Sequence, residues 1–283
     1  MAVARALGDV EIVTVDSMQV YRGMDIGTAK PDLAVRGGVP HHLVDLADPS
    51  EEWTVACWLA AAREVLAGIE ARGRRALLVG GTGLYFRALV DGLCPPGRYP
   101  EVLGELEDEA DTAALHRRLA VLDPTAAARM APANRRRVIR ALEVTLGSGR
   151  PFSSFGPGLD TYPAVPWRVA GLWLPRDTLA RRIARRWETM LAAGLLDEVR
   201  GLAARPGGLA RTARQALGYR ELLAHLEAGV PLAEAGEEAL RRTRAFARRQ
   251  RVWWQRDPRV AWIEVGGNPL AVTARLLGDW SAP

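Results

Sequence analysis

The chain has 283 residues, of which 48% are apolar and 25% are charged, so it is long enough for one large or two modest globular domains. It contains no run of about 18 apolar residues and does not open with a signal peptide, which argues against membrane-spanning and secreted classes. The formal net charge of +5 rests on arginine and favours a polyanionic partner, although an Arg-rich and Ala-rich chain can also reflect genome composition. Its two cysteines, Cys57 and Cys94, fit neither a disulfide framework nor a metal knuckle, so we expect a reducing cytoplasm and no metal site built from protein ligands alone.

The first predicted strand ends at a pair of polar residues. Residues 1–7 predict a helix end closed by Gly8, and the apolar, β-branched run Glu11–Val15 predicts a buried strand. Asp16 and Ser17 follow at once, at the strand end where parallel α/β sheets bind ligands. Asp16 can accept a proton or order a metal-bound water, and the alternative is an aspartate that only caps the next element.

Two adjacent histidines follow in the segment 39–45. His41 and His42 next to Asp45 suggest a metal site, but neighbouring residues rarely point at one ion, so the pattern favours a structural loop. Ser50 is then predicted to cap a helix that runs to about Arg72.

A glycine-rich turn occurs in the segment 75–89, which predicts a strand, a turn at Gly80–Gly83 and a helix. If this strand is parallel to the first, the hydroxyl of Thr82 faces the same edge of the sheet as Asp16. The alternative is a tight turn that needs glycine only for its backbone angles.

The composition changes after the break Cys94–Gly97. An acidic helix over 101–111 and a basic amphipathic segment over 115–122 are predicted there. Asn134 then opens a helix that carries Arg136 and Arg140 on one face, for which a solvated basic surface is the usual explanation.

The rest of the chain is predicted to alternate strands and basic helices. After a long connection over 147–166, residues 168–174 predict a strand and Pro175 starts a helix in which Arg182 and Arg186 lie one turn apart. Their planar guanidinium groups suit phosphate, although either residue could be plain surface. Residues 215–220 form a glycine-containing turn into a helix, where Tyr219 could stack on nucleic acid or pack. A basic helix over 240–256 with two tryptophans suits a nucleic-acid backbone, and a strand over 259–265 and a helix over 269–277 end the chain.

Six strings, in this order, resemble the tRNA dimethylallyltransferases of the IPP transferase family. They are the sixteen residues Asp16–Pro31, the Gly80-Gly81-Thr82 turn, the helix Arg136–Glu143 with its Arg-x-x-x-Arg-Ala-Leu-Glu pattern, Arg182-Ile183-x-x-Arg186, Gly218-Tyr219-Arg220, and Thr243-Arg244 to Arg249-Gln250-x-x-Trp253. The sixteen-residue match is specific, and the resemblance covers nearly the whole chain from Ala4 onward.

The resemblance implies an α/β fold, with a P-loop NTPase-like parallel sheet flanked by helices and a small helical insertion. We expect core segments over 1–93 and 134–283, with the insertion over 94–133 clamping tRNA. The family carries a strand and a Gly-x-x-x-x-Gly-Lys-Ser/Thr phosphate loop upstream of the first helix here, so we expect this first strand and P-loop to be missing from the chain.

The resemblance also implies the site and the reaction. A dimethylallyl group would pass from dimethylallyl diphosphate, with Mg²⁺, to N6 of the adenosine 3′-adjacent to the anticodon, position 37, in tRNAs that read codons beginning with U. Asp16 would be the general base, with Thr82 and Arg186 as further catalytic residues, and Arg182 and Arg186 would bind the donor. The residues implied in tRNA binding are Asp16, Ser17, Met18, Gln19, Arg136, Arg137, Val138, Ile139, Arg140, Gln215, Ala216, Leu217, Gly218, Tyr219 and Arg220.

The expected partner is the anticodon stem-loop of tRNA, with no membrane partner, and the expected state is a cytoplasmic monomer. Two other functions stay open at this point. One is prenylation of free adenine nucleotides by a related enzyme class, which should lack the insertion and the basic C-terminal helix. The other is a truncated, inactive chain that still binds tRNA.

Overall fold

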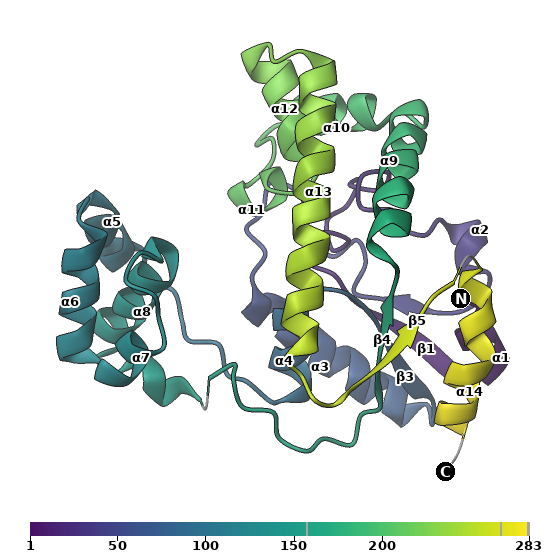
Figure 1. Ribbon diagram of the computed structural model, residues 1–283, viewed down its shortest axis with the longest axis horizontal. Coiled ribbons are helices and arrows are strands. Elements are labelled where there is room, and N and C mark those ends of the chain that lie inside the picture. Colours follow the sequence, from purple (N-terminus) through teal and green to yellow (C-terminus); the bar gives the residue numbers. More distant parts are fainter. Residues whose placement is uncertain (157, 267, 282–283) are drawn as a thin grey trace. The chain divides into compact units, whose positions relative to one another are not determined.

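The computed structural model describes residues 1–156, 158–266 and 268–281 and divides into two compact units. Unit 1 comprises Met1–Leu89 with Val165–Pro283, and unit 2 comprises Val90–Ala164 (Figure 1). Among the described residues, no helix combines the length and the apolar character that crossing a membrane requires.

Unit 1 contains parallel strands, which the structure arranges in two sheets. Strand β1 (Val10–Val15) lies between β2 (His41–His42) and β3 (Arg75–Gly80), and both neighbours run parallel to it. A second parallel pair consists of β4 (Val169–Trp173) and β5 (Val260–Glu264). The expected α/β architecture with parallel strands flanked by helices is therefore confirmed, and its described strands are arranged in two sheets.

The central position of β1 explains why its residues are buried. All six of its residues are buried, including both charged and polar ones, because an internal parallel strand is covered on both faces. Ala4 of helix α1 (Ala2–Leu7) packs against Val10 and Ile12, and Gly8 ends that helix with a positive φ of 74°, as the sequence predicts.

The remaining helices of unit 1 have the following bounds. They are α2 (Leu33–Arg36), α3 (Val55–Ala71), α4 (Gly83–Val90), α9 (Arg176–Ala192), α10 (Leu195–Ala203), α11 (Arg211–Arg214), α12 (Tyr219–Ala228), α13 (Leu232–Gln255) and α14 (Thr273–Ser281), the last preceded by a short 3₁₀ turn, η2 (Pro269–Val272). Helix α3 packs on β1 and β3, whereas helices α9 to α13 pack mainly on one another (Figure 1). Helix α13 has 24 residues and runs from α12 toward α4 (Figure 1), where Trp254 meets Phe86 edge to face at 5.0 Å between ring centres.

The start of helix α3 differs from the sequence prediction. Ser50 does not cap it, because its hydroxyl donates to Asp48 at 2.7 Å within a separate turn. Thr54 is the N-cap, and its hydroxyl accepts the backbone N–H of Cys57. A threonine close to the helix satisfies an orphan amide that a serine four residues earlier cannot reach.

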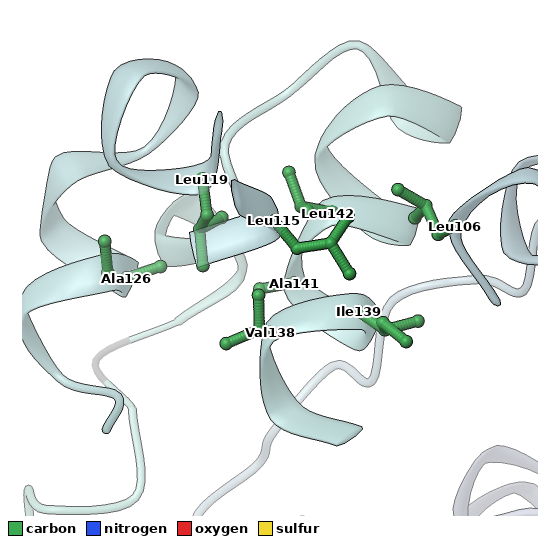
Figure 2. Packing of buried hydrophobic residues seen from close by; sticks show 9 residues of the cluster. Leu106, Leu115, Leu119, Ala126, Val138, Ile139, Ala141 and Leu142 are labelled. Carbon is green, nitrogen blue, oxygen red and sulfur yellow. The ribbon is translucent and has the colours of Figure 1, made fainter. Parts of the chain in front are cut away.

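Unit 2 is a small helical body. It contains α5 (Pro100–Asp108), α6 (Thr112–Leu122), α7 (Pro124–Ala128), α8 (Arg135–Ser148) and the 3₁₀ turn η1 (Phe152–Phe155). Leucines from α5, α6 and α8 converge in its core (Figure 2), and Val138, Ala141 and Leu142 of α8 are fully buried in it.

The domain boundary predicted at residue 133 differs from the structure. Helix α8 belongs to unit 2, whereas the sequence-based division assigns residues from 134 onward to the core. The reason is that the apolar face of α8 is buried against α5 and α6, so the helical body is incomplete without it.

Candidate active site

At the carboxyl end of β1, one carboxylate oxygen of Asp16 accepts hydrogen bonds, and the other, which we call the open oxygen, accepts none from the residues that the structure describes. Its Oδ1 accepts the backbone N–H groups of Met18 at 2.7 Å and Gln19 at 3.2 Å, so the carboxylate does cap the turn that follows. No residue that the structure describes donates a hydrogen bond to the second oxygen, Oδ2, and the side chain is only partly buried. The capping role and a proton-accepting role are therefore compatible, because they use different oxygens.

The glycine-rich turn after β3 lies against the Asp16 loop. Parallel pairing places Val15 opposite Gly80, and the backbone N–H of Thr82 donates to the carbonyl of Val15 at 3.2 Å. The hydroxyl of Thr82 in turn accepts the N–H of Ser17 at 3.2 Å. The sequence prediction that Thr82 and Asp16 share one sheet edge is thus met, and the hydroxyl proton of Thr82 remains available for another acceptor.

The glycines of this turn are required for close approach. A Cβ on Gly80 would lie 2.1 Å from the carbonyl oxygen of Val15, and one on Gly83 would lie 2.0 Å from the indole nitrogen of Trp253. Gln250 donates to the carbonyl of Gly81 at 3.1 Å. Helix α13 therefore supports the turn through Gln250 and Trp253, which gives the Gln250-x-x-Trp253 string a packing role.

Glu198 of helix α10 holds the loop within Asp16–Pro31, which we call the signature loop, and the sequence gives no sign of this role. Its carboxylate accepts three successive backbone N–H groups, from Asp25 at 3.0 Å, Ile26 at 2.8 Å and Gly27 at 3.3 Å. An acidic residue in a predicted helix gives no sequence signal for this contact, because it joins positions more than 170 residues apart.

Tyr219 is a packing residue in this structure. Its ring is fully buried, lies against Gly27 and donates its hydroxyl hydrogen bond to Glu198. Burial raises the pKa of this phenol, and the bond to the Glu198 carboxylate raises that pKa further. Ala216 and Gly218 are also buried, so within 215–220 the side chains open to a tRNA are those of Gln215, Arg220 and, in part, Leu217.

Arg186 faces a pocket beside the signature loop. It is exposed on α9 and lines an open cavity of about 400 Å³ with Asp25, Lys30 and Met190 among its neighbours. Within the described part of the chain, no hydrogen bond or ion pair joins Arg186 to Asp16 or Thr82, so the structure does not bring these three predicted catalytic residues into contact. Arg182, one turn earlier, is partly buried.

The predicted tRNA-binding residues of unit 2 divide into two groups. Arg136 and Arg137 are exposed, whereas Val138 and Ile139 are buried in the helical core. Arg140 donates to the carbonyls of Pro96 at 2.8 Å and Gly97 at 3.0 Å and pairs with Glu143 at 2.8 Å. We therefore expect contact with RNA from Arg136 and Arg137. The other three side chains, those of Val138, Ile139 and Arg140, pack or form hydrogen bonds within unit 2.

The two adjacent histidines are structural, as the sequence analysis favoured. Both lie in β2, where the Nε2 of His42 is 2.6 Å from Glu11 and the Nδ1 of His41 is 2.8 Å from the carbonyl of Val39. They lie in a short strand, whereas the sequence predicts a loop.

The side chains at the ends of β1 and β3 could bind Mg²⁺ only together with oxygens from a substrate. Across residues 1–156, 158–266 and 268–281, no cluster of three or more His, Cys, Asp or Glu side chains could hold an ion. Mg²⁺ is commonly held by one or two carboxylates together with water and substrate phosphates. The Thr82 hydroxyl suits an ion whose other ligands are water and the oxygens of a diphosphate, and this leaves the open oxygen of Asp16 for a proton.

Comparison with known proteins gives consistent matches. The family model described as IPP transferase matches residues 19–257. The tRNA dimethylallyltransferase of Streptomyces coelicolor is 48% identical over 267 residues, covering 93% of this chain and 84% of the relative. That of Geobacter metallireducens is 44% identical over 274 residues, covering 95% and 88%.

Solved structures agree with these matches. The tRNA isopentenylpyrophosphate transferase of Bacillus halodurans is 37% identical with a TM-score of 0.68, covering 98% of this chain and 89% of that one. A eukaryotic dimethylallyltransferase, captured acting on tRNA, shares the fold with a TM-score of 0.78 at 23% identity, covering all of this chain and 76% of that one.

Proposed function

The chain belongs to the IPP transferase family, and from that membership we propose that it is a prenyltransferase that moves a dimethylallyl group from dimethylallyl diphosphate to tRNA. The proposed acceptor is N6 of the adenosine 3′-adjacent to the anticodon, position 37, in tRNAs that read codons beginning with U. The expectations of a monomer and of a cytoplasmic location stay predictions.

One observation supports this reaction most directly. The carboxylate of Asp16 keeps an open oxygen, and the Thr82 hydroxyl binds the N–H of the next residue, Ser17, at the carboxyl ends of two parallel strands. A base must reach the acceptor amine while a hydroxyl donor serves the leaving group, and this strand edge offers both.

The proposed step is a substitution at carbon. N6 of the adenine forms a bond to C1 of the dimethylallyl group as the bond from C1 to the diphosphate oxygen breaks. The proton that N6 loses passes to Oδ2 of Asp16, and the bonding electrons leave with pyrophosphate. Hydrogen bonds from Met18 and Gln19 to Oδ1 fix the carboxylate in place for this transfer.

Charge on the departing pyrophosphate needs cationic or hydrogen-bonding groups. The hydroxyl of Thr82 would donate to it, Arg186 would pair with it, and Arg182 would add to the donor site. Mg²⁺, when bound, would supply further neutralisation of that charge, with the Thr82 hydroxyl as a protein ligand and the open oxygen of Asp16 left for the proton.

The acceptor adenosine must leave its stack to reach Asp16, which costs less in a loop than in a duplex. Asp16, Ser17, Met18 and Gln19 would contact the extruded base. Phosphate contacts from exposed arginines, including Arg136, Arg137 and Arg220, would fix the position of the RNA without reading its sequence.

Single-turnover prenyl transfer tests the proposal. The chain is mixed with labelled dimethylallyl diphosphate and Mg²⁺, and the acceptor is either an anticodon stem-loop or free AMP. We expect label at N6 of the adenosine beside the anticodon and none on AMP. A stem-loop in which guanosine replaces that adenosine is the matched control and should stay unlabelled.

Two other outcomes would contradict the proposed function and indicate a different one. Label on AMP would indicate an enzyme for free adenine nucleotides. Stem-loop binding without any label would indicate a chain that binds tRNA and does not catalyse transfer.

A further inference from the structure

Glu198 of helix α10 accepts hydrogen bonds from backbone N–H groups and from a hydroxyl. Besides the three successive N–H groups of the segment 25–27, its carboxylate accepts the hydroxyl of the buried Tyr219. Within the described ranges no basic side chain pairs with it, and Arg200 on the same helix pairs with Asp197 instead. A carboxylate bound in this way fixes the position of a backbone segment.

The backbone of this segment depends on outside contacts. Ala29, two residues after Gly27, has a positive φ of 48°, which residues with a Cβ rarely adopt. Gly27 packs so closely that a Cβ added to it would lie 2.3 Å from the ring of Tyr219. Glu198 and Tyr219 therefore hold the loop in a conformation that its own sequence does not favour.

Hydrogen bonds continue from this segment to the proposed base. The carbonyl of Thr28, the next residue in the chain, accepts the side-chain N–H of Gln19 at 3.1 Å. The backbone N–H of Gln19 in turn donates to Oδ1 of Asp16 at 3.2 Å. Glu198 is thus connected to Asp16 through the segment 25–28 and Gln19.

We infer that Glu198 is a positioning residue for prenyl transfer, which keeps Gln19 and the carboxylate of Asp16 in the geometry of the reaction by fixing the segment 25–28. The inference rests on the proposed function in taking Asp16 as the base. Glu198 itself takes no part in proton transfer. Because the rate of a reaction between held groups falls steeply when one of them is displaced, a loosened loop slows the step even when the substrates are bound.

Glu198→Gln tests this role. Glutamine keeps the size of the side chain but has one acceptor oxygen in place of two, so it cannot accept all three N–H groups of 25–27 as the carboxylate does. Single-turnover transfer with saturating dimethylallyl diphosphate and anticodon stem-loop gives a rate constant and an amplitude. We expect the rate constant to fall about ten-fold and the amplitude to stay unchanged.

The amplitude separates positioning from plain stability. A residue that only stabilises the fold would lower the amplitude, because fewer molecules are active, and would leave the rate constant unchanged. That result would overturn the inference. The matched control is Asp197→Asn, which removes the same charge from an exposed neighbour on α10 that pairs only with Arg200 among the described residues. It should keep both the rate constant and the amplitude.

A double variant tests the path through Gln19. Gln19→Met removes the bond to Thr28 and keeps the length of the side chain. Two residues that act through one connection have non-additive effects, so adding Glu198→Gln to Gln19→Met should slow transfer by less than about two-fold. A further ten-fold loss would show that Glu198 acts by another route and would overturn the inference.

Amide hydrogen exchange, followed residue by residue by NMR spectroscopy without substrates, tests the connection independently of activity. Glu198→Gln should speed exchange at Ile26 and Gly27 at least about ten-fold and at Gln19 about three-fold, whereas Asp197→Asn should change none of them. Unchanged exchange at Gln19 would overturn the inference, whether or not the unmodified chain transfers a prenyl group. Absence of transfer by the unmodified chain would instead contradict the proposed function.

Discussion

Strand β1 carries one carboxylate near each end, and their surroundings are opposite. Glu11, near the start, is buried and meets three basic side chains: Arg72 donates to it at 3.1 and 2.8 Å, Arg74 lies 3.4 Å away, and His42 lies 2.6 Å away. Asp16, just past the other end, is partly exposed and receives two backbone N–H bonds on one oxygen only.

The difference shows how one strand separates stability from chemistry. The Arg72 hydrogen bonds, helped by His42, hold the pKa of the Glu11 carboxyl at about 2, against the penalty of burial. A carboxylate held in this way stays charged and joins β2, β1 and the chain after α3. A carboxylate with an open oxygen at the carboxyl end of the strand is free to exchange a proton with a ligand.

The largest expected effect comes from removing the proposed base. Asp16→Asn should slow single-turnover prenyl transfer at least about 100-fold, because the amide cannot accept the proton from N6. Its Oδ1 can still accept the N–H groups of Met18 and Gln19, so the unfolding midpoint should not change. An unimpaired rate would remove Asp16 from the mechanism.

The second effect concerns stability alone. Glu11→Gln should lower the free energy of unfolding by about 2 kcal/mol, since it removes the charge that the basic cluster surrounds. Urea unfolding measures this change, and the transfer rate of the folded protein should stay normal. The control is Asp9→Asn, at an exposed pair with Arg75, which should cost less than about 0.5 kcal/mol. Equal losses at the two positions would contradict the distinction.

A smaller effect tests the hydroxyl beside Asp16. Thr82→Ala should reduce the transfer rate about ten-fold, because it removes both the acceptor of the Ser17 N–H and the proposed donor to pyrophosphate. Thr82→Ser keeps the hydroxyl and should retain most of the rate. If both variants are equally slow, the methyl group and its packing matter, and the hydroxyl does not.

The smallest effect is a pH dependence. The pKa of Glu11 is about 2 in the folded protein against an ordinary value of 4.5, so its stabilisation is fully present above pH 4.5 and is lost as the pH falls toward 2. Between pH 5 and 3.5 the unmodified chain should lose about 1 kcal/mol more of its unfolding free energy than Glu11→Gln. Parallel losses in the two proteins would show that Glu11 is not protonated on unfolding in this range.

The sequence by itself determined much of the local structure and the position of the base. The β-branched run before Asp16, the glycines before Thr82 and the periodicity of the long helices each encode their element within a few neighbouring residues. The sequence predicts a shared edge for Asp16 and Thr82 only if the two strands are parallel. The structure shows that β1 and β3 are parallel, and the two residues do share that edge.

Only the tertiary structure decided what each polar side chain faces. Glu198 holding the loop 25–27, Tyr219 buried against Gly27, Arg140 bound to the carbonyls of Pro96 and Gly97, and α8 packing into unit 2 all depend on contacts between distant segments. Local patterns fix backbone conformation, because propensities and turns act over a few residues. The partners of a side chain depend on packing across the whole fold, which no stretch of sequence contains.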